Sequence, residues 1–138
     1  MIKSLYKASQ QGVKIQMIVR GICCLIPREL QMSENIEVVS IIDKFLEHTR
    51  FMIFCNDNSN NVYISSADWM TRSLENRVEV TCPIIDKKLK KEILDIFNMY
   101  WNDNVKSRLV NHPKINKHKR NSKPYFRSQD EIYNYYLK

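Results

Sequence analysis

Two groups of polar side chains have the types and the spacing needed to handle a phosphate group. His48 and Arg50 stand two residues apart at the mouth of an expected strand, so we expect both side chains on one face. An imidazole transfers protons near neutral pH, and a guanidinium binds phosphate oxygens through paired donors. Fifteen residues after Arg50, the run Ser65–Trp69 places hydroxyl and carboxylate groups at an expected helix start, where main-chain amides favour an anion.

The same residues also have purely structural interpretations, which the sequence leaves open. A histidine at the position of His48 is typical of a helix C-terminus, where a cation favours the helix dipole. Ser66 and Asp68 are also typical N-terminal caps of the short helix expected after them. That capping role is compatible with binding a ligand.

Arg20 is a further candidate because it follows an expected strand. Val13–Val19 alternates apolar and polar side chains, which is the periodicity of a strand. Arg20-Gly21 then falls at the carboxyl end of that strand, where open α/β sheets place their ligand groups. The chain has 2 glycines in all, so a glycine-rich phosphate loop is excluded.

The elements that must position these residues alternate between helix and strand, which predicts an α/β fold. Strands are expected at Val13–Val19, Thr49–Cys55, Val62–Ser65 and Arg77–Cys82, the last stopped by Pro83. Helices are expected at Lys3–Gln11, which ends before Gly12, at Asp68–Leu74, from Asp86 to about Asp103, and at Ser128–Leu137. A further helix is expected to begin at a capping box formed by Ser40 and Asp43. Its apolar residues Ile41, Ile42, Phe45 and Leu46 would share one face. The turn Asp57–Asn61 predicts a hairpin between the second and third strands.

The net charge of +7 on these 138 residues lies entirely in the C-terminal quarter. Residues 1–103 carry 13 basic and 13 acidic side chains, whereas residues 104–138 carry 9 basic and 2 acidic ones. Such a segment indicates contact with a polyanion: a nucleic acid, a phosphate polymer or a membrane surface. A solvated basic tail without a partner is the alternative.

Several classes of protein are excluded. No apolar run approaches the ~20 residues that cross a bilayer, so we expect no integral membrane segment, and no secretory signal is visible. The four cysteines, Cys23, Cys24, Cys55 and Cys82, form no C-x-x-C pair, which favours free thiols in a reducing compartment. We therefore expect a cytoplasmic protein, with peripheral contact at the inner face of the membrane left open.

The H-x-R pattern at His48 and the S-S-x-D pattern at Ser65 together resemble the H-x-K and G-S-x-N pattern of phospholipase D-like phosphotransferases. Arg50 stands in place of the lysine, Ser65 in place of the glycine, and Asp68 in place of the asparagine. The acidic residue expected five positions after the basic one is replaced by Cys55.

Longer segments resemble the C-terminal region of bacterial polyphosphate kinase, from about Ser4 to Leu137. The matching segments, all in the family's order, are Val19–Pro27, Ser33–Ile36, Ile41–His48, Tyr63–Arg72, Arg77–Val80 and Arg127–Gln129 with Ile132-Tyr133. The resemblance implies a phospholipase D-like domain with a mixed sheet flanked by helices. Residues 1–110 would form the catalytic domain, and residues 111–138 a basic segment of the same domain that ends in a docking helix. One departure is Arg28–Met32, where the family usually carries glycines.

The resemblance implies reversible transfer of the terminal phosphate of ATP to inorganic polyphosphate through a phosphohistidine. That histidine belongs to a preceding domain, so none of His48, His112 and His118 is expected to be phosphorylated. Arg20 and His48 match active-site positions of the family and are implied to contact the nucleotide phosphates. ATP or ADP and polyphosphate are the implied substrates. Mg²⁺ is held outside this segment, and the remaining kinase domains and further copies in a homo-oligomer are the implied partners.

The chemistry of the side chains agrees with phosphoryl transfer, which depends on positioning and on neutralising phosphate charge. Arg20 and Arg50 would neutralise that charge, so Arg50 joins Arg20 and His48 as a phosphate-binding residue. His48 would protonate the leaving oxygen or stabilise it as a cationic donor. We expect this chain by itself to be inactive.

Glu79, expected on a neighbouring strand, is the candidate to orient the imidazole, with Ser66 and Asp68 as supporting polar groups. A surface ion pair of Glu79 with Arg77 or Arg72 is the alternative. No metal ligand is expected in the chain.

Two other functions stay open. The chain could be a non-catalytic polyanion-binding module that uses Lys106–Arg127, with the main contributions from Lys114, Lys117, Lys119 and Arg120. It could also be a phospholipase D-like phosphodiesterase or nuclease that acts as a dimer, with one His48 from each chain. Arg50 in place of lysine and the missing acidic residue argue against the second.

Overall fold

The computed structural model describes residues 1–57, 59–110 and 117–137. The chain forms two compact units, which we describe separately: Met1–Glu47 with residues from Met99 onward, and His48–Asn98. Helix α3, Lys87–Asn102, contributes its last residues to the first unit and the rest to the second.

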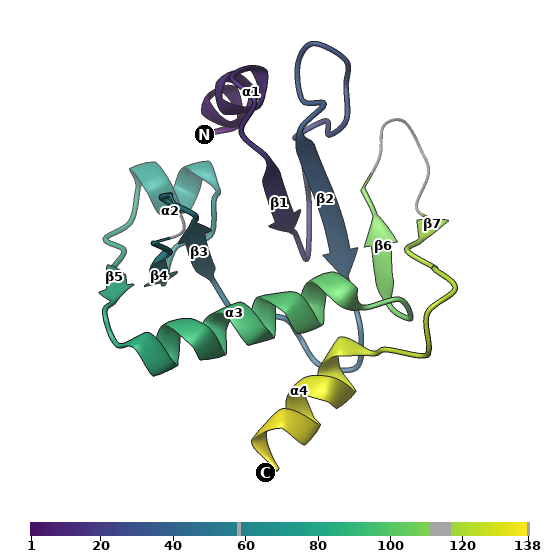
Figure 1. Cartoon of the computed structure of the whole chain (residues 1–138). Helices are drawn as coiled ribbons and strands as arrows, with labels where there is room; N and C mark the ends of the chain where they lie inside the picture. Colours follow the sequence, from purple (N-terminus) through teal and green to yellow (C-terminus); the bar gives the residue numbers. More distant parts are fainter. Residues whose placement is uncertain (58, 111–116, 138) are drawn as a thin grey trace. The chain divides into compact units, whose positions relative to one another are not determined.

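The first unit contains a mixed four-stranded sheet of order β1-β2-β6-β7. Strands β1, Ile15–Ile18, and β2, Ile36–Ile41, run parallel, as the two neighbouring arrows in Figure 1 show. Strand β6, Ser107–Leu109, runs antiparallel to β2, and β7, Lys117–His118, runs antiparallel to β6. The prediction of a mixed sheet is therefore confirmed.

Helix α1, Ile2–Gln10, covers the core of this unit. Its side chains Leu5 and Tyr6 pack against the buried residues Leu25, Ile36 and Val38. The helix ends as expected, because Gly12 adopts a φ of 85°, a left-handed conformation that costs glycine little.

The prediction of a helix from Ser40 is wrong, because this part of the chain is the end of strand β2 followed by an irregular segment. The run Ile36–Ile41 is rich in β-branched residues, and four of its six side chains are buried in the sheet. Asp43 does not cap a helix: its carboxylate accepts from the amide of Lys44 and from Arg127 instead.

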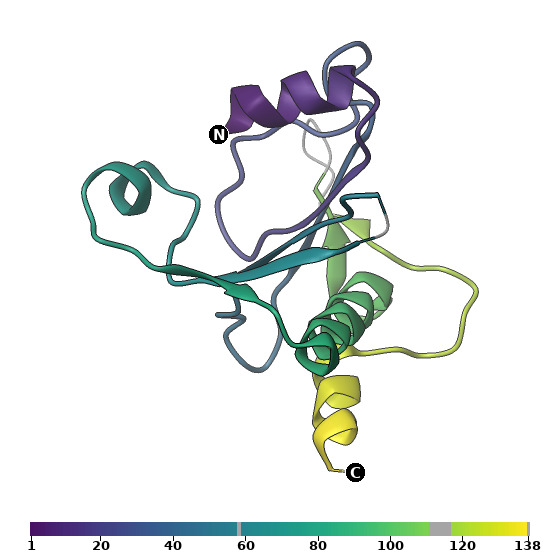
Figure 2. The same ribbon diagram turned by 60° about the vertical axis from the view of Figure 1, so that its left-hand side comes forward.

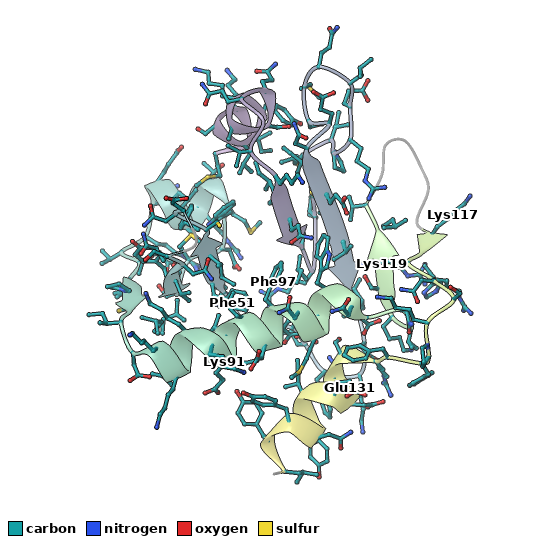
Figure 3. All side chains as sticks on the ribbon, viewed as in Figure 1. Phe51, Lys91, Phe97, Lys117, Lys119 and Glu131 are labelled. Carbon is teal, nitrogen blue, oxygen red and sulfur yellow. The ribbon has the colours of Figure 1, made fainter. Side chains whose placement is uncertain are left out.

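The second unit is built on an antiparallel three-stranded sheet of order β3-β4-β5. Strands β3, Phe51–Phe54, and β4, Asn61–Ser65, form the predicted hairpin. Figure 3 shows Phe51 of β3 beside Phe97 of α3, and their rings meet edge to face with centroids 6.3 Å apart. The short helix α2, Thr71–Glu75, lies in the long connection from β4 to β5 that Figure 2 shows.

Two boundaries in this unit differ from the prediction. Strand β5 is Thr81–Ile84, so residues 77–80 are not strand and Pro83 lies inside it. Proline is tolerated there because β5 is an edge strand, whose outer side needs no amide donor. Helix α2 begins at Thr71 rather than Asp68, because the Asp68 carboxylate binds Arg50 and caps no helix.

The remaining two helices begin where the sequence places them. Asp86 accepts from the amides of Lys88 and Leu89 at 2.8 and 3.0 Å and so caps α3. Helix α4 is Ser128–Tyr136, close to the predicted Ser128–Leu137. None of the helices in the described part of the chain combines the length and the apolar character needed to cross a bilayer.

The loop after Ile26-Pro27 contains two non-glycine residues with left-handed backbone. Arg28 has a φ of 60° and Gln31 a φ of 62°. Two residues within Arg28–Met32 therefore adopt a conformation that glycine accommodates more easily.

Candidate functional site

A cleft of about 330 Å³ lies at the carboxyl ends of the parallel strands β1 and β2. Its lining residues are Arg20, Ile41, Ile42, Asp43, Phe45, Leu46 and Glu47. Arg20 follows β1 and Ile41 ends β2, so the cleft is in the position where open α/β sheets bind ligands. The prediction that Arg20 lies at such a strand end is confirmed.

Arg20 is held against the segment that leads to His48. Its Nη1 atom donates a hydrogen bond of 2.5 Å to the main-chain oxygen of Glu47. The carboxylate of Glu47 accepts a bond of 2.6 Å from the hydroxyl of Tyr100 and another of 2.6 Å from the side-chain amide of Gln129. Glu47 is thus fixed through its main chain and through both carboxylate oxygens.

In the second unit, His48, Arg50 and Asp68 form a connected group. The Arg50 Nε donates to the Asp68 carboxylate at 2.7 Å. Its Nη1 and Nη2 atoms lie 3.2 and 3.4 Å from the Nδ1 and Nε2 atoms of the His48 ring. The hydrogen bond that Arg50 donates to the Asp68 carboxylate raises the pKa of Arg50, so the guanidinium next to the imidazole stays charged.

Ser66 and Glu79 form a second group in the same unit. The Ser66 hydroxyl donates to the Glu79 carboxylate and accepts from the amide of Val80 at 3.0 Å. The Ser66 amide in turn donates to the Val80 carbonyl at 3.0 Å. Ser66 and Glu79 therefore brace the chain just before β5, and Glu79 lies in an irregular segment and not on the expected strand.

Comparison with known proteins identifies the family. The family model described as "Polyphosphate kinase C-terminal domain 2" matches residues 1–129. A curated polyphosphate kinase of Vibrio parahaemolyticus is 48% identical over 135 residues, which cover 97% of this chain and 19% of that protein. The polyphosphate kinase of Escherichia coli K12 is 42% identical over 136 residues, 98% of this chain and 20% of that protein. The chain belongs to the polyphosphate kinase C-terminal domain family.

A solved structure gives the same result for this polyphosphate kinase domain. The crystal structure of polyphosphate kinase from Porphyromonas gingivalis matches with a TM-score of 0.95 and 44% sequence identity, over 99% of this chain and 21% of that chain. The phospholipase D-like α/β fold class expected from the sequence is therefore confirmed. The chain spans about one fifth of the length of the relatives that it matches.

The structure brings the site residues named from the sequence into three places. His48, Arg50 and Asp68 are together, Ser66 and Glu79 are together, and Arg20 lies in the cleft of the first unit. Arg50 contacts His48 directly, but both residues lie in the irregular segment before β3 and not on the expected strand. The contact of Glu79 is with Ser66, and no ion pair of Glu79 with Arg72 or Arg77 is among the contacts of the described residues.

Sequence reasoning missed the residues that hold the segment between β2 and His48. Asp43, whose side chain is 2% exposed, accepts bonds of 2.7 Å on both oxygens from Arg127 and lies 3.8 Å from Lys106. The bond from Arg127 outweighs burial and lowers the pKa of Asp43. The only sequence signal for this pair was that both residues fall within segments that resemble the family.

Asp103 is a second buried carboxylate that the sequence did not single out. It is fully buried, and its Oδ1 accepts from the amides of Val105, Lys106 and Ser107 at 2.7–2.9 Å. Its Oδ2 accepts 2.8 Å bonds from the amide and hydroxyl of Ser128. Burial alone would raise the pKa of Asp103, but these amide donors outweigh it and lower the pKa.

The described residues do not form a donor set for a metal ion. They contain no group of three or more His, Cys, Asp or Glu side chains that could hold one. Both buried carboxylates described above are already occupied by Arg127 and by amide donors.

Proposed function

We propose that this chain is the C-terminal domain of a larger polyphosphate kinase, which transfers the terminal phosphate of ATP to inorganic polyphosphate and back. The observation that carries the proposal is the match to kinases at 42–48% identity over 97–98% of the chain. Arg20 and His48 occupy positions that suit such a reaction, because one lies in a strand-end cleft and the other directly follows a residue lining it.

In this proposal Arg20 and His48 contact the nucleotide phosphates. Phosphoryl transfer needs in-line positioning and neutralisation of the charge on the phosphate oxygens. Arg20 supplies a fixed guanidinium for that charge, and His48 donates a proton or hydrogen bond to the leaving oxygen. Arg50 acts on the same phosphate or on the imidazole that it contacts, while Asp68, Ser66 and Glu79 support the two clusters.

Other parts of the proposal concern the whole enzyme. The phosphohistidine and any Mg²⁺ belong to domains outside this chain, and residues 1–110 work together with the basic segment 111–138 as one domain. The complete enzyme is a cytoplasmic homo-oligomer. His112, one of the histidines considered from the sequence, lies outside the described residues.

A hybrid kinase tests the proposal. In it, this chain replaces the matching 136-residue segment of the Escherichia coli polyphosphate kinase. We expect the hybrid to make polyphosphate from ATP and the His48→Ala variant to lose the activity without a change in thermal unfolding. Thr49→Ala is the matched control, since Thr49 is exposed on the same segment, and it should leave the rate unchanged.

Two results would count against the proposal. An inactive hybrid that is folded would refute the kinase assignment, and an active His48→Ala variant would refute the role of His48. We also expect the 138-residue chain alone to show no transfer between ATP and polyphosphate. Appreciable transfer by the chain alone would overturn the view that the rest of the enzyme supplies half of the site.

The basic C-terminal segment supports a second candidate function, the binding of a polyanion. Strand β7 lies at the end of the sheet, and Lys117 on it is exposed (Figure 3), as are Arg120 and Lys123 after it. Lys119 is less accessible, because its amine donates to the Trp101 carbonyl and lies over the Trp101 ring. Burial accordingly lowers the pKa of Lys119.

Binding of polyphosphate at different salt concentrations tests this second function. Affinity should fall steeply with salt, and replacing Lys117 and Arg120 by glutamine should weaken binding more than His48→Ala does. Lys114, named from the sequence for the same role, lies outside the described residues. Equal binding by the double variant at low salt would exclude this segment as the polyanion site.

A further inference from the structure

The segment between β2 and His48 is ordered by polar contacts and not by a hydrophobic core. It has no regular secondary structure, and its apolar side chains Ile42, Phe45 and Leu46 are 70%, 63% and 76% exposed. Apolar burial therefore fixes little of its path. His48 is the next residue after this segment, so the contacts that hold the segment also determine the position of the His48 main chain.

Besides the contacts of Arg20 and Tyr100 with Glu47, the segment is held from the start of α4, more than 80 positions later in the sequence. The side-chain amide of Gln129 accepts from the Phe45 amide at 3.1 Å and donates to the Phe45 carbonyl at 2.9 Å. The same nitrogen lies 2.6 Å from the Glu47 carboxylate. The Gln129 side chain thus bonds both main-chain groups of Phe45, as a neighbouring strand would, and it also contacts Glu47, the residue before His48.

Arg127 adds the second point of attachment. Its Nε and Nη2 atoms each donate a 2.7 Å bond to the Asp43 carboxylate, which is almost completely buried. Such a bidentate pair fixes orientation as well as distance. Ser128, between the two residues, is fully buried and is bound to Asp103, so the turn that carries Arg127 and Gln129 is itself anchored.

We propose that Arg127 and Gln129, at the start of α4, are positioning residues that hold Asp43–Glu47 and thereby place His48 for phosphoryl transfer. We call these two residues with Asp43 and Glu47 the α4 clamp. The inference rests on the proposed function, because it gives His48 the role stated there. It gives α4 a role in catalysis, although the residues Tyr133 and Tyr136 of this helix are exposed.

The α4 clamp predicts a loss of turnover rather than of substrate binding. A displacement of about 1 Å at a reacting group costs about 100-fold in rate, so Gln129→Ala should lower kcat of the hybrid kinase by about 10- to 100-fold. KM for ATP should stay within about threefold, because Arg20 and the other phosphate contacts remain. Arg127→Lys should act in the same direction, since lysine keeps the charge but loses the bidentate geometry.

Two further measurements separate positioning from loss of stability. Amide hydrogen exchange should become faster at Phe45 and its neighbours through His48 in Gln129→Ala, because the Phe45 amide loses its acceptor. Asn134→Ala is the matched control, since Asn134 is an exposed side chain on the same helix. It should change neither kcat nor the exchange, and both variants should unfold within a few degrees of the parent.

The outcomes distinguish this inference from the proposed function. Slower turnover of Gln129→Ala with faster exchange at residues 45–48 supports the α4 clamp. Unchanged kcat, or unchanged exchange, overturns it even if His48→Ala is inactive. If His48→Ala keeps full activity, the proposed role of His48 is refuted. The catalytic role of the α4 clamp is then refuted as well, because it acts through His48.

Discussion

Arg20 is hydrogen-bonded to the main-chain oxygen of Glu47, with the Nη1 and oxygen atoms 2.5 Å apart. Glu47 directly precedes His48, and the Glu47 carbonyl belongs to the same planar peptide unit as the His48 nitrogen. A side chain at the end of β1 is therefore bonded to the peptide group from which His48 begins. Arg20 and His48, two of the three residues implicated by sequence in phosphate contact, are linked through one carbonyl.

Replacing Arg20 tests whether its guanidinium does more than tie down this carbonyl. We expect Arg20→Ala in the hybrid kinase to lower the rate of polyphosphate synthesis by about 1,000-fold, as for other arginines that stabilise transferring phosphate. Arg20→Lys should recover part of the rate, because it restores the charge but not the fork of donors. Arg77→Ala, at an exposed arginine, is the control and should be neutral. An Arg20→Ala enzyme with half the parent rate would contradict the assignment.

Asp68 should influence activity through Arg50. The Arg50–Asp68 pair is partly exposed, with side-chain exposures of 22% and 25%, so its loss should change the stability of the domain little. We expect Asp68→Asn to release Arg50 from its position beside His48 and to slow turnover by about 10-fold. The double variant Asp68→Asn with Arg50→Ala should be no slower than Arg50→Ala alone, which initial rates will measure. Additive losses would show that the two residues act separately.

The buried Asp103 makes the stability of the domain dependent on acid pH. Because folding lowers the pKa of Asp103, the carboxylate contributes stability above its unfolded pKa of about 3.9, and this contribution is lost as the pH falls through the folded pKa. Asp103→Asn should lower the free energy of unfolding by about 3 kcal/mol at pH 7, because the side-chain nitrogen of the asparagine would face the amide and hydroxyl donors of Ser128. Its unfolding free energy, measured by urea titration, should then vary less with pH below about 4 than that of the parent. Glu34→Gln, at an exposed carboxylate, should keep the parent's pH profile.

Gln31 offers a stabilising substitution. A non-glycine residue with a φ of 62° carries a backbone strain of about 1–2 kcal/mol. Glycine would remove this strain, but it loses more chain entropy on folding, so only part of the strain energy would be gained as stability. The Gln31 side chain is exposed, and its carbonyl, which accepts from Gln10, is kept in the variant. We expect Gln31→Gly to raise the unfolding free energy by up to about 1 kcal/mol. Gln31→Ala, which relieves no strain, should give no gain, and equal melting temperatures of Gln31→Gly and the parent would refute the strain.

Local patterns in the sequence were sufficient where the structure depends on local contacts. The hairpin of β3 and β4, the Asp86 cap and the Gly12 helix end all involve residues close in sequence, and all are confirmed. The expected helix at Ser40 failed because the S-x-x-D pattern looks like a capping box, while Asp43 has its main partner in Arg127, 84 positions away. Strands β6 and β7 are three and two residues long, too short to show a periodicity.

The same distinction applies to the candidate site. His48, Arg50 and Asp68 could be grouped from short spacings, and Arg20 could be placed by its strand end. Gln129 could not be found in this way, because a lone glutamine in a polar helix has no pattern that distinguishes it. Its role depends on where tertiary packing brings the start of α4, a relationship that exists only in the folded chain.

The lysine-bearing strand β7 also has a consequence for solubility. Among the described residues it is the last strand in the sheet order, and an edge strand can recruit a strand from another molecule. Any second copy that added its own β7 there would have to bring Lys117 and its basic neighbours against the same cations. Electrostatic repulsion at this edge thus discourages aggregation by strand addition, and we expect that protection to weaken as added salt screens the charges.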